Sequence, residues 1–279
     1  PQHKDPIDII VCVHNALEDV ERCLQSILKQ TTLPYRIILV DDGSDSPTEV
    51  FLKKFKENYQ DVLLIRNDEA KGYTFAANIG MRASTAPYFI LLNSDTIVTP
   101  GWVDRLYRAM QLDDSIAVVG PLANTASWQS IPRLFDNRDW ADNPLPPGVT
   151  VEKMADLVAK YSGYLFPEVP LLNGFCMMIR REAIDKVGLF DEETFGQGYG
   201  EEDDFNLRVG YAGLKKVIAD DTYIYHAQSK SYSFEKRMRL SAISGEKLKK
   251  KHGLQTIESA VSTMHPSRLF EGIRSRASV

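Results

Sequence analysis

Four short apolar runs in the first hundred residues each stop at a cluster of polar side chains. Between the runs lie segments whose apolar residues recur at three-to-four spacing, the pattern of an amphipathic helix. The runs occupy residues 7–13 (IDIIVCV), 36–40 (RIILV), 62–65 (VLLI) and 88–92 (YFILL). This alternation predicts an α/β fold with a Rossmann-like, mostly parallel central sheet and helices on both faces.

The polar clusters follow the runs directly. They are His14-Asn15, Asp41-Asp42-Gly43-Ser44, Asn67-Asp68 and Asn93-Ser94-Asp95. Because ligands of such sheets bind at the carboxyl ends of the strands, we expect these four clusters to share one ligand-binding edge.

Several further elements follow from local signals. Ser46 as N-cap, Pro47 at the first helical position and Glu49 three residues after Ser46 predict a capped helix start. We also expect helices at 74–83 and 151–160 and a strand at about 215–219. The proline-rich segment 121–170 is mostly irregular, which is typical of binding loops and lids, and we interpret it as the wall of a second substrate site.

Length and composition limit the function classes. With 279 residues, 43% of them hydrophobic, the chain suits one large domain: residues 1–232, with a nucleotide-binding half at about 7–120 and an acceptor half at 121–232, then a helical extension at 233–279. A formal charge of −5 argues against nucleic-acid partners. The three separated cysteines predict reduced core thiols and a reducing compartment. No run of about 18 apolar residues or signal-peptide layout is present, so we expect a cytoplasmic protein.

Each polar cluster has a structural and a functional interpretation. Asn93-Ser94-Asp95 suits a capping turn, but also an oxygen-ligand site for Mg²⁺ or Mn²⁺. Asp41-Asp42 suits a turn, or hydrogen bonds to a ribose or base. Lys71 and Gly72 before a helix suit a solvated loop, or a phosphate site.

Two later features offer similar choices. A glycine-rich loop is followed by Glu201-Glu202-Asp203-Asp204. These acidic residues are explained either by favourable interaction with the helix dipole or by a crowded carboxylate that acts as a general base. His226 at a strand end suits a structural histidine, or a ligand.

The order of these motifs resembles glycosyltransferase family 2, whose members have the GT-A fold. DDGS, KGYTFAANIG, LLNSD, GFCMMIRREAIDKVGLFDE, GEEDDFNLRVGYAG and YH follow one another between about Asp8 and His226. The resemblance implies an inverting transfer of a sugar from a nucleoside-diphosphate donor to an acceptor hydroxyl, with Mn²⁺ or Mg²⁺ as cofactor, in polysaccharide or glycoconjugate synthesis.

The resemblance also implies roles for individual residues. Asp95 takes the place of the last acidic residue of the family's D-x-D motif and, with His226, would bind the metal. Glu202 aligns with the catalytic base, and a one-residue slip selects Asp203 instead. The donor would contact Val13, His14, Asn15, Asp41, Asp42, Lys71, Asn78, Asn93 and Ser94. A glycan or glycolipid acceptor would contact Asn173, Gly174 and Trp128.

Three other classes compete with this interpretation. A sugar-1-phosphate nucleotidyltransferase would carry a glycine-rich basic loop after the first strand, where this chain has HNALEDVERC. A dinucleotide oxidoreductase would carry G-x-G-x-x-G there. A non-catalytic nucleotide-sugar-binding module would gain nothing from the acidic cluster.

The sugar, the acceptor and the choice among UDP, GDP and dTDP stay open. The basic stretch KLKKKHG at 247–253 suits a solvated helix face, or contact with an anionic inner membrane surface.

Overall fold

A computed structural model describes residues 6–136, 139–196, 198–227, 234–264, 271–272 and 274–275. Within these residues an eight-stranded sheet has the order β3-β2-β1-β4-β9-β6-β10-β5, and β7 and β8 form a separate pair. The sheet strands are β1 (Ile7–Val13), β2 (Tyr35–Asp42), β3 (Val62–Asn67), β4 (Tyr88–Asn93), β5 (Thr96–Ile97), β6 (Ile116–Ala123), β9 (Cys176–Arg180) and β10 (Lys215–His226); the pair is β7 (Phe135–Asp136) and β8 (Asp139–Trp140).

The first four sheet strands run parallel, as the sequence pattern predicts. β1 lies between β2 and β4, and their registers place Val13 beside Asp41 and Cys12 beside Asn93. The polar clusters that end these strands therefore meet at one edge. β9 runs antiparallel to both β4 and β6, β10 runs parallel to β6, and β5 is antiparallel to β10.

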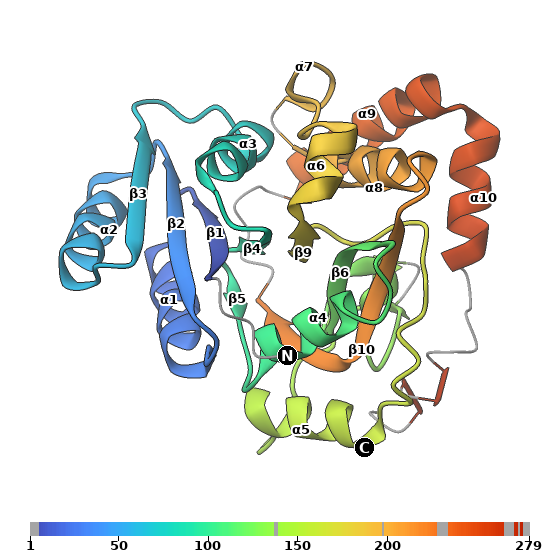
Figure 1. Ribbon diagram of the computed structural model, residues 1–279, viewed down its shortest axis with the longest axis horizontal. Helices are drawn as coiled ribbons and strands as arrows, with labels where there is room; N and C mark the ends of the chain where they lie inside the picture. The colour runs from blue at the N-terminus through green and yellow to red at the C-terminus, as the bar shows by residue number, and fades with distance from the viewer. Residues whose placement is uncertain are drawn as a thin grey trace.

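Helices cover both faces of the sheet, and Figure 1 shows α3, α6 and α8 gathered on one side of it. They are α1 (Leu17–Gln30), α2 (Ser46–Asn58), α3 (Tyr73–Ala83), α4 (Trp102–Met110), α5 (Val151–Tyr161), α6 (Arg181–Val187), α7 (Glu192–Phe195), α8 (Glu201–Tyr211), α9 (Phe234–His252) and α10 (Leu254–Met264), with a 3-10 turn, η1, at Ser127–Gln129. Because successive strand residues face opposite sides, Ile9 and Val11 of β1 pack with α1, whereas Ile10 packs with α3. Two cores result, one on each face.

Three details of the structure differ from the sequence expectations. The cap of α2 is Asp45, not Ser46: its side chain accepts the N–H of Thr48 at 3.2 Å. Glu49 pairs instead with Lys53 and Arg66, so the expected capping box was wrong. β10 continues to His226, well beyond the expected end at 219, after an irregularity between Ala219 and Tyr223.

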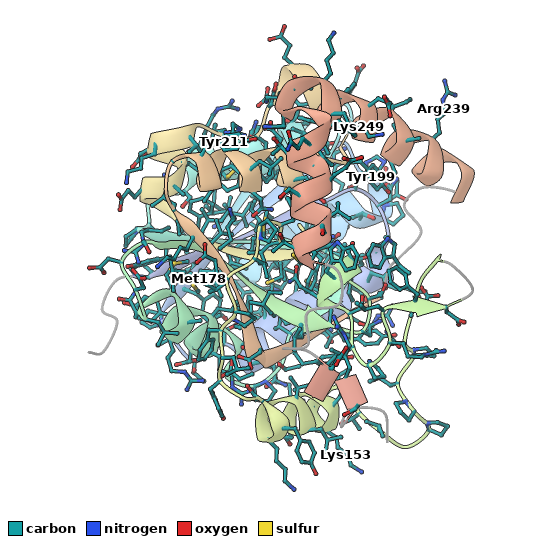
Figure 2. The ribbon with its side chains drawn as sticks, turned by 90° about the vertical axis from the view of Figure 1, so that its right-hand side faces the viewer. Lys153, Met178, Tyr199, Tyr211, Arg239 and Lys249 are labelled. Carbon is teal, nitrogen blue, oxygen red and sulfur yellow. The ribbon has the colours of Figure 1, made fainter. Side chains whose placement is uncertain are left out.

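The C-terminal helices pack beside the sheet domain, as Figure 1 shows for α9 and α10. In Figure 2 this side faces the viewer, with Met178 of β9 lying deeper in the molecule. Helicity after residue 233 agrees with the sequence expectation for the described part of the tail. Across the part of the chain that the structure describes, none of the helices combines the length and the apolar character needed to cross a bilayer.

Candidate active site

Asp95 and His226 lie together at one end of the sheet. β10 pairs with β5 so that His226 is opposite Thr96, the residue that follows Asp95. The imidazole Nε2 is 3.3 Å from Asp95 Oδ1, and both side chains are mostly buried. Burial alone would lower the pKa of His226, but the charge of Asp95 and its hydrogen bond raise the pKa above its usual value.

Two residues after β6 orient this histidine, and sequence reasoning missed both. The carbonyl of Thr125 lies 2.9 Å from His226 Nδ1, so Nδ1 donates to this carbonyl and Nε2 is directed to Asp95. Asn124 accepts the backbone N–H of His226 at 2.8 Å and donates to the carbonyl of His226 at 2.9 Å. An Asn-Thr pair at a strand end was the available signal, but it lies within the segment read as irregular.

This pair fits a divalent cation bound together with a diphosphate. A carboxylate oxygen and an imidazole nitrogen that is held by a backbone carbonyl on its other side form a usual ligand arrangement. In the residues that the structure describes, no three His, Cys, Asp or Glu side chains converge as a metal cluster. An ion held by Asp95 and His226 would have room for further oxygen ligands, such as substrate phosphates and water.

The segment Asn173-Gly174-Phe175 connects the histidine to the acidic helix. The ring of Phe175 stacks on the His226 imidazole with centroids 5.2 Å apart, and its carbonyl accepts the N–H of Asn93 at 2.8 Å. Gly174 faces Glu202: a Cβ added there would lie 3.3 Å from Glu202 Cβ and 3.4 Å from its Cγ. Residues 173–175 therefore contact three of the predicted site residues, namely Asn93, His226 and Glu202.

Glu202 occupies the first turn of α8. Its Oε2 accepts the N–H of Gly200, the N-terminal flanking residue of the helix, at 3.1 Å. Burial raises the pKa of the Glu202 carboxyl, although backbone hydrogen bonds oppose the shift. A carboxylate with a raised pKa and a fixed orientation has the properties of a general base.

Glu201 and Tyr73 lie next to this carboxyl with unpaired atoms. Glu201 is 4% exposed, and its Oε2 has no hydrogen-bond partner in the described structure; nor does the buried hydroxyl of Tyr73. Burial and then the charge of Glu202 raise the pKa of Glu201 well above its usual value. The charges of both glutamates contribute to a raised pKa of the Tyr73 phenol, after burial. Tyr73 was missed because its motif, KGYTFAANIG, drew attention to Lys71 and Gly72.

The last two acidic residues of the cluster differ in environment. The side chain of Asp203 makes no hydrogen bond to another described residue, and burial followed by the charge of Glu202 raises the pKa of its carboxyl. Asp204 is fully buried and accepts from Arg208 Nε and His252 Nε2, both at 2.8 Å. The choice of base stays between Glu202 and Asp203, and Asp204 has a structural role.

The ends of β1 and β2 lie side by side at the edge where we predict donor binding. His14 Nδ1 lies 2.8 Å from the carbonyl of Asp42. Asn15, in the left-handed region at φ 59°, donates its N–H to Ser44 Oγ and accepts the N–H of Asp45. These bonds tie the two turns together next to Val13, which is 1% exposed.

Both acidic residues of DDGS serve the protein itself. Asp41 is 1% exposed, pairs with Arg66 and accepts the N–H of Ser44. Asp42 accepts the N–H groups of Lys71 and Gly72 and an N–H of Asn67. The amides expected to approach a phosphate at Lys71-Gly72 therefore already donate to Asp42.

Other predicted donor contacts divide into two groups. Asn78 is fully buried, donates to the Phe190 carbonyl and Glu192 Oε1, and accepts the N–H of Phe190, so its amide clamps α3 to α7. In contrast, Lys71 is exposed, and the partly buried Asn93 and Ser94 make no side-chain hydrogen bonds within the described chain.

The predicted acceptor residues are adjacent in space but differ in packing. Asn173 Nδ2 donates to Ser127 Oγ at 3.1 Å, and Ser127 precedes Trp128. Trp128 packs edge-on against Trp140 and Phe135, with centroids 5.0 and 6.0 Å away. Gly174 thus borders the acidic helix directly. Asn173 is joined to the turn that carries Ser127, and Trp128 belongs to an aromatic cluster.

The cysteines agree with the expectation of free thiols. Cys12, Cys23 and Cys176 form no disulfide. Burial raises the pKa of Cys23 to about 12, so this thiol stays protonated.

Comparisons with known proteins bear on both fold and family. The model of glycosyl transferase family 2 matches residues 8–188. Glycosyltransferase GlyG of Streptococcus pneumoniae is 25% identical over 81% of this chain and 72% of its own length. An N-acetylglucosaminyl-diphospho-decaprenol L-rhamnosyltransferase of Mycobacterium tuberculosis is 25% identical over 85% of this chain and 81% of its own length. Of other curated relatives the chain spans only a third or so of the length, 35% in one case and 30% in another.

Solved structures confirm the GT-A fold. GalNAc-T7 with UDP, GalNAc and Mn²⁺ superposes with a TM-score of 0.61 and 18% identity, covering 85% of this chain and 48% of that one. Mannosyltransferase PcManGT of Pyrobaculum calidifontis, with GDP-Man and Mn²⁺, gives 0.58 and 16% identity, covering 99% and 85%. Because the family match extends over more than half of the chain, the protein belongs to glycosyl transferase family 2 and is a glycosyltransferase.

Proposed function

We propose that this glycosyltransferase is divalent-metal-dependent and inverts the anomeric centre, moving a sugar from a nucleoside diphosphate to a hydroxyl of a glycan, lipid-linked or protein-linked acceptor. The observation that carries the proposal is the tripeptide 173–175, which contacts His226 through Phe175 and Glu202 through Gly174. Because the proposed cation site and the proposed base both contact residues 173–175, they can act on the two sides of a single reacting carbon.

The donor's diphosphate is assigned to Asp95 and His226. Mn²⁺ or Mg²⁺ bound there would neutralise charge on the departing nucleoside diphosphate. Asn93 and Ser94 lie two residues and one residue before Asp95, and we assign their unpaired polar groups to the ribose or the sugar. Lys71 supplies a mobile positive charge at the same edge of the sheet.

The nucleoside is assigned to the edge formed by β1 and β2. His14 and Asn15 present this edge, while Asp42 fixes the loop that carries Lys71. Asp41 and Asn78 support the site from behind and do not take part in our donor contacts. The proposed donor contacts are therefore fewer than the donor-binding residues that the sequence suggested.

Glu202 is proposed to take the proton from the acceptor hydroxyl. The N–H of Gly200 directs its carboxylate, and the raised pKa brings its basicity closer to what a hydroxyl requires. One displacement then forms the glycosidic bond as the bond to the diphosphate breaks, and no covalent enzyme intermediate is needed. Asp203 remains the alternative base.

The acceptor is proposed to lie over Asn173 and Gly174, with Trp128 at the border. The name of the Mycobacterium tuberculosis relative describes a lipid-linked acceptor, which supports that class for this chain. It also supports a place in surface polysaccharide or glycoconjugate synthesis. Work at the cytoplasmic face of a membrane would follow from such an acceptor.

A screen of nucleotide sugars with Mn²⁺ tests the proposal. The expected result is release of nucleoside diphosphate from one donor, rising when a matching acceptor is added and abolished by a chelator. Release of pyrophosphate instead, or turnover that ignores the chelator, would contradict it. The stereochemistry of the product, read by NMR, tests inversion separately.

A further inference from the structure

The tail helix α9 lies directly against the start of the acidic helix α8. A Cβ added to Gly200, whose φ is +89°, would lie 3.2 Å from Ser244 Cβ and 3.3 Å from Leu248 Cδ1. Ser244 and Leu248 are both buried. Since the N–H of Gly200 holds Glu202 Oε2, α9 packs on the very residue that orients the proposed base.

The end of α9 also binds the carboxylate of Asp204, two residues after Glu202. Lys251 Nζ lies 2.6 Å from Asp204 Oδ1, and His252 Nε2 lies 2.8 Å from the same oxygen. Arg208 of α8 takes the other oxygen. A fully buried carboxylate needs such partners, so the first turn of α8 is held where Lys251 and His252 can reach it.

The same two residues reach further along α7 and α8. Lys251 forms a second ion pair with Asp191 at 2.7 Å, at the start of α7. His252 Nδ1 lies 3.0 Å from the hydroxyl of Tyr211, the last residue of α8. In Figure 2 the α9–α10 pair faces the viewer, with Tyr211 to one side of it. Both ends of α8 are therefore fixed by consecutive residues of α9.

A third contact fixes the segment that leads into the acidic helix. Lys247 Nζ donates to the carbonyl of Thr194 at 2.6 Å. Three basic residues of the stretch 247–253 thus bind the protein itself, whereas Lys250 is exposed and Lys249 pairs with Glu246 on the surface. These contacts give the stretch a role that differs from the membrane contact its composition suggested.

We propose that Lys251 and His252 are positioning residues for the transfer reaction, which hold Glu202 in its orientation through Asp204 and Gly200 and make α9 part of the catalytic unit. The inference rests on the proposed function of Glu202. All of these α9 residues lie beyond residue 188, where the match to the family model ends.

An electrostatic consequence separates this role from simple packing. The groups that face Glu202 are Glu201 and Asp203 on its own helix and the phenol of Tyr73 from α3, none of which carries positive charge. Asp204, two residues after Glu202, is paired with Arg208 of α8 and with Lys251 and His252 of α9. Removal of the Lys251 charge leaves the negative charge of Asp204 less compensated, and we expect this to raise the pKa of Glu202 further. The acidic limb of the pH profile then moves to higher pH.

The test compares Lys251→Met with Lys250→Met in the full chain. Lys250→Met removes the same charge one residue away and is the matched control. For Lys251→Met we expect kcat to fall about tenfold or more, a donor KM within twofold of wild type, and an acidic limb shifted upward. Amide hydrogen exchange of residues 200–205 should accelerate. Lys250→Met should match wild type, and Lys251→Arg should recover most of the activity.

Two results would overturn the inference. One is a lowered melting temperature of Lys251→Met with unchanged kcat and pH profile, which means that α9 only stabilises the fold. The other is an equal loss in the Lys250 and Lys251 variants. If Lys251→Met does not fold, Lys251→Gln, which keeps much of the side chain's length, takes its place with the same criteria. Failure of the proposed function is distinct, because wild type would then transfer no sugar at all.

Discussion

Replacing Glu202 with Gln removes the proposed base and little else. The side chain keeps its shape, its amide oxygen can still accept the N–H of Gly200, and its contact with Gly174 is unchanged. Only proton acceptance is lost. General base catalysis contributes roughly 10²–10⁴-fold, which at about 1.4 kcal/mol per factor of ten corresponds to about 3–6 kcal/mol of barrier.

Release of nucleoside diphosphate under saturating donor and acceptor measures this loss. We expect kcat of Glu202→Gln to fall by that factor while donor binding, followed by calorimetry, stays within twofold of wild type. The control is Asp203→Asn, which should keep most of the activity. Near-normal turnover of Glu202→Gln, or the loss appearing only in Asp203→Asn, would refute the assignment of the base.

Three further outcomes follow from the same structure. The methyl group of Gly174→Ala would lie 3.3 Å from Glu202 Cβ, so the Glu202 side chain must shift slightly. We expect kcat to fall by about tenfold to a hundredfold while donor binding is retained. An unchanged kcat would contradict the contact between Gly174 and Glu202. The pKa of Glu202 is raised, and the base must be ionised to act. As the pH falls, kcat should therefore be lost with a midpoint above the usual glutamate pKa of about 4.3. A midpoint of the pH profile at or below that value would speak against burial of the base. Asp8 is 1% exposed and held by Arg36; burial alone would raise the pKa of Asp8, but the bonds from Arg36 keep it lowered. Asp8→Asn should therefore cost about 3 kcal/mol in urea unfolding at pH 7. The cost should shrink as the pH falls through the lowered pKa of Asp8, because the wild-type carboxylate then becomes protonated as well.

The edge at which the polar clusters meet could be predicted from the sequence because it depends on strand ends. A parallel strand that is buried on both faces has a characteristic composition, and its carboxyl end is marked where polar residues begin. The registers Val13 to Asp41 and Cys12 to Asn93 confirm that these ends meet. The roles of individual polar residues there were not predictable. Asp41 and Asn78 have all the features of ligand contacts until their partners, Arg66 and Phe190, are placed.

The other half of the site depends on long-range pairing. The sequence identified His226, but its place beside Asp95 results from a two-residue strand, β5, that is too short to be predicted. The antiparallel direction of β9 could not be predicted either, because its apolar composition is the same as that of a parallel strand. The support that α9 gives to α8 joins residues 40 or more positions apart, and neither helix alone shows a need for the other.

The most direct test of the account is calorimetric titration of a nucleoside diphosphate into the wild-type protein and into Asp95→Asn, each with Mn²⁺ and with a chelator. We predict that the wild type binds UDP, GDP or dTDP at least tenfold more tightly with Mn²⁺, and that Asp95→Asn loses this difference while it keeps the weaker metal-independent affinity. Equal affinity of the two proteins in Mn²⁺, or binding of the wild type that the chelator leaves unchanged, would contradict a cation site at Asp95.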